Sequence, residues 1–298
     1  MIKIKKLLII SIIYLWFIVL PVFPQDSTEV PVTKVVQLNS HIWEISIAGC
    51  NHVVSIGNDG VFLVDANYKE LCRYLINVID SLGGKEVDYV VNTHWHFDHV
   101  GCNLIFGYNS KIISSKKNLE LLSEDRFLLG DTIKALPYYA LPEIVFDDEY
   151  RMRFNGEIIE MFILAGHTCS DVIVYFPESN IVHIGDLIFG NMFSFVDINH
   201  GGNVLAIYES VKKLCEILPV NTKIIMGHGM IYSVEDLRKH GEMVKYTYDI
   251  VRKKIESGMS PEEIKKQEVL NEYKEWGKAF SCDNWIDYIC ESVKKNKQ

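Results

Sequence analysis

The chain has 298 residues and a formal net charge of −9, from 39 acidic and 30 basic residues. Apolar residues make up 48% of the chain and charged residues 23%, which is typical of a globular protein able to bury a large core. The acidic balance argues against nucleic acid as a partner, because a phosphate backbone attracts basic surfaces. We therefore expect one globular domain over residues 30–298 and no nucleic-acid partner.

The first residues differ in character from the rest of the chain. Three lysines among the first six residues precede an apolar run over residues 7–20, a pattern typical of a secretory signal. No small-residue cleavage motif stands out over residues 23–27, so an uncleaved membrane anchor is the alternative. We predict a signal peptide or anchor over residues 1–24 and a periplasmic or secreted location for the remainder. The membrane is then a partner only through this segment, if it stays uncleaved.

The first β-rich half begins near residue 35. Short runs of β-forming residues alternate with Gly, Asn and Asp over residues 35–65, which predicts antiparallel strands joined by hairpins. Helical spacing follows over residues 70–82 and stops at a pair of glycines. Residues 88–94 then predict a buried strand.

The second half repeats this order. Strand-like apolar runs cover residues 161–167, 171–176 and 181–186, a helix is predicted over 204–218, and another strand over 223–228. Two such halves predict an α/β protein in which two sheets lie between helical layers. Residues 234–297 are predicted to form a C-terminal helical extension, with one helix starting at Ser260 and Pro261.

Residues 126–142 show neither the helical nor the strand period. They contain two prolines and the paired tyrosines Tyr138 and Tyr139. We predict a long loop here, and long loops in compact domains often have a functional role.

The seven cysteines are too few and too scattered for a disulfide framework, and their odd number leaves at least one unpaired. Cys282 and Cys290 are eight residues apart in a helical pattern, which separates them by about 12 Å, beyond disulfide reach. We expect most of the cysteines to be small buried apolar residues.

Residues 92–103, NTHWHFDHVGCN, place His94, His96, Asp98 and His99 within six positions after a predicted strand. Imidazole and carboxylate are the usual non-sulfur ligands of zinc and similar divalent cations. Residues two apart in an extended chain share a face, so His94 and His96 can bind one cation while Asp98 and His99 face a second. Because these groups would repel one another without a cation, the sequence predicts a metal site here.

Three further candidate ligands, His167, Asp186 and His228, stand where later strands end. Each follows a glycine, which we expect to let the backbone leave the strand at an unusual dihedral angle. Taken singly, each could be an ordinary surface or turn residue, but the repetition favours metal ligands. Asp171 is expected to support the loop that holds His167. The remaining histidines are expected to be structural or surface residues, namely His41, His52, His183, His200 and His240.

With these residues the chain resembles the metallo-β-lactamase superfamily. The resemblance rests on HWHFDH over residues 94–99, AGHT at His167, GD at Asp186 and GHG around His228, and it covers residues 35 to about 233. It implies an α/β fold, a four-layer αββα sandwich, with two divalent cations, most commonly Zn²⁺, at the edge of the sheets. The family pattern would assign the first metal to His94, His96 and His167, the second to Asp98, His99 and His228, and the bridging position to Asp186.

The ligand at position 186 separates the subfamilies. Asp186 resembles the bridging aspartate of glyoxalase II and similar thioesterases, whereas β-lactamases of the first subclass have a cysteine there. This departure weakens a β-lactam assignment but leaves it open. Flavodiiron proteins carry Glu where His96 stands, and nuclease members have an added domain and a basic surface, so neither fits this chain.

The resemblance predicts a secreted metal-dependent hydrolase with a small-molecule substrate. Two cations would lower the pKa of a shared water, and the bridging hydroxide would attack an ester, thioester, lactone or lactam. Asp98 would also be catalytic, by steering a proton to the leaving group. Three alternatives stay open: a class B-like β-lactamase, a mononuclear iron enzyme of the persulfide dioxygenase type, and a non-catalytic metal-binding module.

Aromatic residues are concentrated near the predicted site. Residues 189–202, which include Phe193 and Phe195, directly follow Asp186, and Tyr138 and Tyr139 lie in the predicted loop. Apolar groups beside a metal suit a substrate with a hydrophobic portion. The alternative is that Phe193 and Phe195 only pack the loop.

Overall fold

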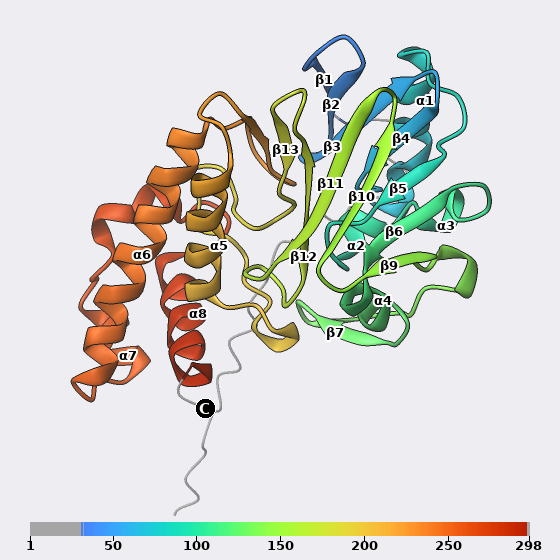
Figure 1. The fold of residues 1–298 in the computed structure, drawn as a ribbon. Helices are drawn as coiled ribbons and strands as arrows, with labels where there is room; N and C mark the ends of the chain where they lie inside the picture. The colour runs from blue at the N-terminus through green and yellow to red at the C-terminus, as the bar shows by residue number, and fades with distance from the viewer. Residues whose placement is uncertain (1–30, 32, 297–298) are drawn as a thin grey trace, which may run out of the picture. The chain divides into compact units, whose positions relative to one another are not determined.

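The computed structural model describes residue 31 and residues 33–296. The segment predicted as a signal peptide or anchor, residues 1–24, lies outside the described residues. Within the described part, no helix combines the length and the apolar character needed to cross a bilayer. Two large sheets and the helices on their outer faces make up most of this part of the chain, and a two-stranded sheet completes it (Figure 1).

The larger sheet has seven strands in the order β1-β2-β3-β4-β5-β6-β9, and the smaller has five in the order β10-β11-β12-β13-β14. In the larger sheet the pairs β1-β2, β2-β3 and β3-β4 are antiparallel, and the pairs β4-β5, β5-β6 and β6-β9 are parallel. In the smaller sheet only the pair β13 and β14 is parallel. The strands are β1 (Thr33–Gln37), β2 (Ile42–Ile47), β3 (Cys50–Gly57), β4 (Gly60–Val64), β5 (Tyr89–Val91), β6 (Lys111–Ser115), β7 (Arg126–Leu128), β8 (Asp131–Ile133), β9 (Ile144–Phe146), β10 (Glu149–Phe154), β11 (Glu157–Leu164), β12 (Asp171–Phe176), β13 (Ile181–His183) and β14 (Lys223–Ile225).

The helices lie between these strands and after the last of them. The α-helices are α1 (Cys72–Ser81), α2 (Phe97–Val100), α3 (Asn103–Phe106), α4 (Lys116–Leu122), α5 (Val204–Ile217), α6 (Val234–Glu256), α7 (Pro261–Lys266) and α8 (Cys282–Lys295). The 3₁₀ helices are η1 (Lys69–Leu71), η2 (Tyr138–Ala140), η3 (Ile198–His200) and η4 (Asn271–Trp276).

The two faces of each sheet are buried in different apolar clusters, because successive side chains of a strand point to opposite faces. In β3, Val53 faces the cluster between the two sheets, and its neighbour Val54 faces the cluster under α1. In β12, Val172 and Val174 face the space between the sheets, and Ile173 faces the helices on the other side. Strands buried on both faces explain the nearly continuous apolar runs of the sequence.

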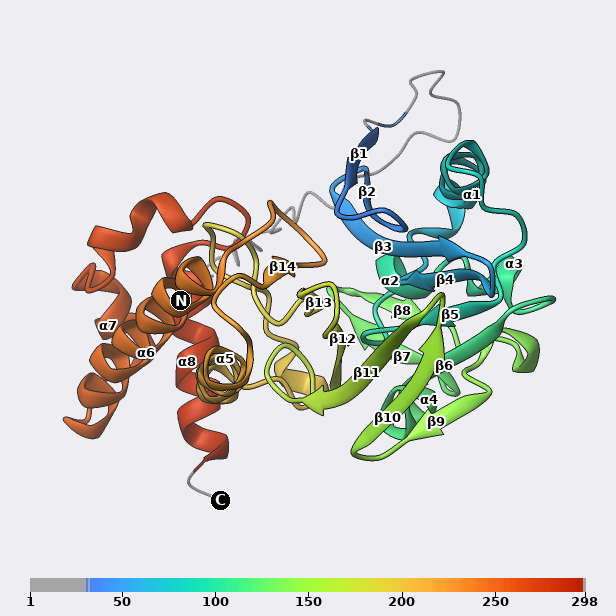
Figure 2. The same cartoon turned by 45° about the horizontal axis from the view of Figure 1, so that its top comes forward.

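Helices cover the outer face of each sheet. The face of α1 with Leu75 and Ile79 packs on the larger sheet, and α5, α6 and α8 contact one another on the smaller one (Figure 2). Side-chain hydrogen bonds fix the starts of the C-terminal helices, which Ser233, Ser260 and Ser281 cap. Each serine hydroxyl oxygen accepts from the backbone N–H of the third residue of its helix, and each serine backbone N–H donates to the side chain of that residue. The four-layer αββα arrangement predicted from the sequence is therefore confirmed.

The expectation of a long loop over residues 126–142 is wrong. β7 and β8 form a two-stranded antiparallel hairpin, and a 3₁₀ turn follows at Tyr138–Ala140. Leu129 and Gly130, with φ of 51° and 91°, make the turn. The strands of this hairpin are three residues long and mostly exposed, so they lack the apolar run that predicted the equally short strands β5, β13 and β14.

One pair of cysteines forms a disulfide that the sequence analysis did not identify. Cys72, at the start of α1, is bonded to Cys102, three residues after His99. The other five cysteines are free, including Cys282 and Cys290, which were correctly predicted not to pair. The bond links the first helix to the turn that follows the histidine cluster.

Candidate metal centre

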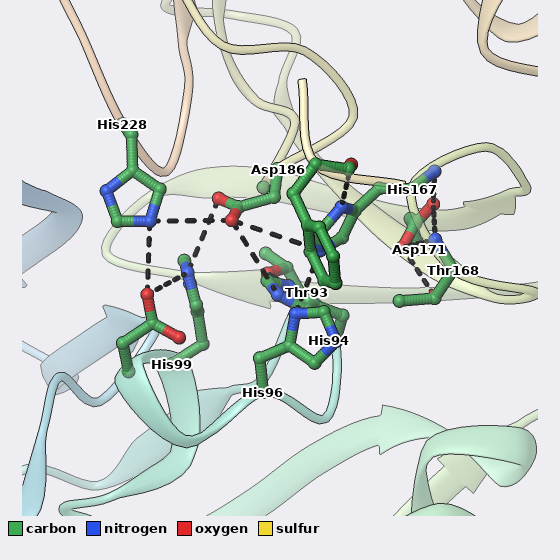
Figure 3. A network of polar contacts seen from close by, with 12 residues as sticks. Thr93, His94, His96, His99, His167, Thr168, Asp171, Asp186 and His228 are labelled. Carbon is green, nitrogen blue, oxygen red and sulfur yellow. Dashed lines mark hydrogen bonds and ion pairs between the residues drawn. The ribbon is translucent and has the colours of Figure 1, made fainter. Parts of the chain in front are cut away.

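The seven predicted ligands come together at one edge of the two sheets (Figure 3). His94 and His96 follow β5, and Asp98 and His99 lie in α2. The other three follow β11, β13 and β14 in the second half of the chain. They form two groups in which the potential ligand atoms lie within 4.8 Å of one another: a first group of His94, His96 and His167, and a second group of Asp98, His99, Asp186 and His228.

In the first group, each histidine has one ring nitrogen beside a hydrogen-bonding partner outside the group. Nδ1 of His167 donates to the carbonyl oxygen of Phe195 at 2.8 Å, and Nε2 of His96 donates to Asp197 Oδ2 at 3.1 Å. Nδ1 of His94 lies 3.0 Å from the hydroxyl of Thr93. These contacts fix the ring orientations and leave the opposite nitrogens for the centre of the group.

The second group repeats this arrangement. Nδ1 of His99 donates to Asp65 Oδ2 at 2.8 Å, and Nδ1 of His228 donates to the carbonyl oxygen of Gly49 at 2.9 Å. The Nε2 atoms of both rings face Asp98 and Asp186. All five imidazoles are therefore held from outside with one nitrogen turned inward, as metal-binding histidines are.

The inward-facing atoms fit a cation better than they fit one another. Nε2 of His94, Nε2 of His99 and Oδ1 of Asp186 are buried without a hydrogen-bond partner. Nδ1 of His96 and Nε2 of His167 lie 3.0 Å apart. In each ring the other nitrogen is the one that donates a hydrogen bond outside the group. Because buried polar atoms without partners are rare and costly, their convergence is the mark of a site for positive ions.

Asp186 lies between the two groups. Its Oδ1 is 3.3 Å from His99 Nε2, and its Oδ2 is 3.4 Å from His228 Nε2. The same Oδ2 lies 3.9 Å from Nε2 of both His94 and His167 in the first group. A carboxylate between two sets of imidazoles has the geometry that a bridging ligand needs.

The electrostatics of the two groups differ. Burial, reinforced by neighbouring histidines, lowers the pKa of His94 well below its usual value and that of His167 to about 4, so these imidazoles are neutral. Burial opposes charge on Asp98 and Asp186 too, but His99 and His228 hold the pKa of both carboxyl groups well below their usual range. Neutral imidazoles and ionised carboxylates are the forms in which these side chains bind metal. Burial opposes charge on His99 and His228, but Asp186 and Asp98 raise the pKa of both, so a cation would displace their protons.

The three glycines before the later ligands serve two different purposes. Gly185, before Asp186, has φ of 54°, as expected from the sequence. Gly166 and Gly227 do not have a positive φ, so the expected reason is wrong for them. A Cβ on Gly166 would lie 2.7 Å from Leu187, and a Cβ on Gly227 would lie 2.0 Å from Asp186 Oδ1. At these two positions the small residue is needed for close approach.

Asp171 supports the loop of His167, as predicted. Its carboxylate accepts hydrogen bonds from the backbone N–H groups of His167 and Thr168 and from the Thr168 hydroxyl. These bonds fix the backbone that presents His167 to the first group. His52, His183 and His240 are buried and belong to neither group, and His41 is half-buried beside Glu157.

Three residues around the site were not identified from the sequence. Asp65 bonds His99, Asp197 bonds both His96 and His200, and the Cys50 thiol lies 3.9 Å from Asp98 Oδ2. Asp65 could have been found, because it directly follows β4, which is parallel to β5 and ends at the same edge. Asp197 and Cys50 have no comparable signal, since their positions depend on how the loops and β14 pack.

The aromatic residues that were predicted to lie near the site differ in what they contact. Phe193 is fully buried and stacks on Trp285 at 5.1 Å, so it packs the core. The ring of Phe195 lies 5.7 Å from that of His96 and 5.8 Å from that of His167. Tyr139 stacks on Tyr108 at 4.4 Å.

Comparison with known proteins agrees with this geometry. The family model described as "Metallo-beta-lactamase superfamily" matches residues 50–228. A hydroxyacylglutathione hydrolase of Pelagibacter ubique is 30% identical over 159 residues, which is 51% of this chain but only 56% of that relative. The metallo-beta-lactamase IND-1 of Chryseobacterium indologenes is 27% identical over 68% of this chain and 79% of its own length. The structure of a metallo-beta-lactamase from Pontibacter korlensis shares the fold, with a TM-score of 0.60 and 18% identity over 72% of this chain and 99% of that one.

Proposed function

The chain belongs to the metallo-beta-lactamase superfamily, and we propose that it is a hydrolase that uses two divalent cations to cleave an ester, thioester, lactone or lactam of a small molecule. The observation that carries this proposal is the arrangement of the five imidazoles. One nitrogen of each ring contacts a partner outside the two groups. The other nitrogen faces Asp98, Asp186 or another imidazole. Zn²⁺ is the cation we propose, because sets of nitrogen and carboxylate ligands suit it.

Each group would hold one cation. His94, His96 and His167 would bind the first, and Asp98, His99 and His228 the second, with Asp186 between them. Once bound, the pair would supply a water of lowered pKa as nucleophile and would polarise the carbonyl group that is attacked.

Asp98 has a position from which it can steer a proton. Its side chain is 13% exposed, compared with 4% for Asp186, so it lies on the more open side of the second group. It is ionised, because the charges of His99 and His228 outweigh its burial and hold its pKa low. We propose that Asp98, as an ionised hydrogen-bond acceptor, would orient the water that gives its proton to the leaving group.

Hydrolysis of a β-lactam is a second candidate. It is favoured by the similarity to the metallo-beta-lactamase IND-1, which extends over 68% of this chain. The aspartate at position 186 favours the thioesterase-like reading instead, since the first-subclass β-lactamases resemble this chain elsewhere but have a cysteine there. A panel of substrates that contains both bond types decides between them.

We also propose that the protein works outside the cytoplasm. The apolar run over residues 7–20 supports export. The disulfide between Cys72 and Cys102 is consistent with an oxidising compartment, because such bonds are rare where thiols are kept reduced. Fractionation of expressing cells, followed by thiol labelling of each fraction, tests both points.

The central experiment compares the purified chain with His96→Ala and Asp186→Ala, using metal analysis and hydrolysis of an ester, a thioester, a lactone and a β-lactam. We expect two metal equivalents in the natural protein, fewer in each variant, and no turnover in either variant despite unchanged circular dichroism. His41→Ala is the matched control, since His41 is half-buried beside Glu157 and should lose neither metal nor activity.

Other outcomes would replace the proposal. Full activity in either metal-loaded variant contradicts the ligand assignment. Oxygen consumption with iron but not with zinc would indicate the mononuclear dioxygenase alternative. Two bound metals without hydrolysis of any substrate would indicate a metal-binding module.

A further inference from the structure

Three phenylalanine rings lie together beside the two ligand groups. Phe189 and Phe195 follow Asp186, and Phe280 lies just before α8 in the C-terminal extension. The ring of Phe280 is 5.5 Å from Phe195 and 6.2 Å from Phe189. We call these three residues the aromatic wall.

The aromatic wall faces the imidazoles that would bind metal. Phe189 is 5.1 Å from the ring of His228, which belongs to the second group. Phe195 is 5.7 Å from the ring of His96, which belongs to the first. The wall therefore adjoins both groups, so a substrate bound at the two groups would lie beside it.

Two members of the wall differ from an ordinary core residue. Phe193, on the same segment, is fully buried against Trp285 and has no surface to offer a ligand. Phe195 and Phe280 are only partly buried. Apolar surface that is left partly exposed beside a reactive centre is a characteristic of ligand sites.

We propose that the aromatic wall binds the apolar acyl portion of the ester, thioester or lactone that is hydrolysed, and that the C-terminal extension sets this preference through Phe280. This inference rests on the proposed hydrolase function. The extension lies outside the residues matched by the family model, 50–228, so the preference would be a property of this chain. Each methylene fully removed from water contributes about 0.8 kcal/mol, which corresponds to about a fourfold increase in kcat/KM.

The test measures kcat/KM for a series of p-nitrophenyl esters from acetate to decanoate on the zinc-loaded full-length protein. We expect kcat/KM to rise up to fourfold per methylene and the rise to flatten in Phe280→Ala. Phe280→Leu should retain part of the rise, because it keeps most of the apolar surface. Phe127→Ala is the matched control, since Phe127 is 60% exposed on β7, and its chain-length dependence should equal that of the natural protein.

A binding measurement separates this inference from the hydrolase proposal. Titration of the zinc-loaded protein with neutral alkyl amides of increasing length measures how tightly an alkyl chain binds at the aromatic wall, without turnover. Tighter binding of longer amides, lost in Phe280→Ala, would support the wall even if no ester were hydrolysed. Hydrolysis without any effect of chain length, or an equal effect of chain length in Phe280→Ala, would reject the wall and leave the hydrolase proposal in place.

Discussion

Asp65 Oδ2 accepts a hydrogen bond from His99 Nδ1 at 2.8 Å, behind the ring whose other nitrogen faces Asp186. Asp65 also accepts bonds from the N–H and hydroxyl groups of Thr93, and it has a φ of 63°, which few residues adopt. The carboxylate is thus fixed on both sides, so that it can orient His99.

Replacement of Asp65 by Asn should weaken metal binding at the second group. The neutral amide accepts a weaker bond from His99, and loss of such a partner typically lowers metal affinity tenfold to a hundredfold. Competition with a chelator should therefore remove one of two zinc equivalents more readily from the variant. Asp59→Asn changes a remote aspartate, which accepts from the Asn155 N–H, and should have no effect. Equal retention of both equivalents in Asp65→Asn would contradict the role given to Asp65.

Gly227→Ala should displace the bridging carboxylate. The added Cβ would lie 2.0 Å from Asp186 Oδ1 and 2.7 Å from His99 Cε1, so one of these side chains must move. We expect a loss of zinc from the second group and a large decrease in kcat, measured by metal analysis and hydrolysis. Gly277→Ala is the control, because its nearest contact would be 3.2 Å, to Lys274 O. Unchanged zinc content in Gly227→Ala would show that the site can relax around the methyl group.

The sequence was sufficient to group the candidate ligands but not to identify the residues that orient them. His94, His96, Asp98 and His99 are adjacent in the chain, so their grouping follows from local spacing. Asp197 reaches His96 from a loop 101 residues later, and only the packing of that loop brings them together. The helices and strands of both cores could likewise be predicted, because burial on one or both faces leaves a periodic pattern.

Short and irregular elements were the ones missed. β7 and β8 contain three residues each and are mostly exposed, so neither a period nor an apolar run marks them, and the segment was expected to be a loop. The disulfide between Cys72 and Cys102 depends on the distance between two elements, which spacing along the chain does not determine. Phe280 could not be related to the site from the sequence, because it is 94 positions beyond Asp186.

Removal of the disulfide should destabilise the protein. The bond closes a loop with a sequence separation of 30 residues, and in the chain-entropy model such a link contributes about 3–4 kcal/mol to the free energy of unfolding. The double variant Cys72→Ser, Cys102→Ser should unfold at a lower urea concentration than the natural protein, and reductant should shift only the natural protein. Cys282→Ser, at a free and partly buried cysteine, is the control. A natural protein unaffected by reductant would contradict the expectation.

His240 should make the fold sensitive to acid. Both of its ring nitrogens are buried without a partner beside Trp276, and burial lowers its pKa to about 3. Its pKa in the unfolded chain is the ordinary value of 6.5, so between pH 6.5 and 3 the unfolded state binds more protons. Stability is fully present above pH 6.5 and is lost as the pH falls towards 3, by an amount on the order of 4 kcal/mol.

His240→Leu removes this term, so its free energy of unfolding should fall less steeply with acid than that of the natural protein. His167, whose pKa burial lowers to about 4, also takes up a proton in this range, but it is the same in both proteins and cancels in the difference. Urea unfolding at several pH values from 7.5 to 4 measures that difference. Lys239→Gln, at the exposed neighbouring position, should give a curve parallel to that of the natural protein. If the curve for His240→Leu is parallel as well, then His240 becomes protonated within the folded protein and burial does not lower its pKa.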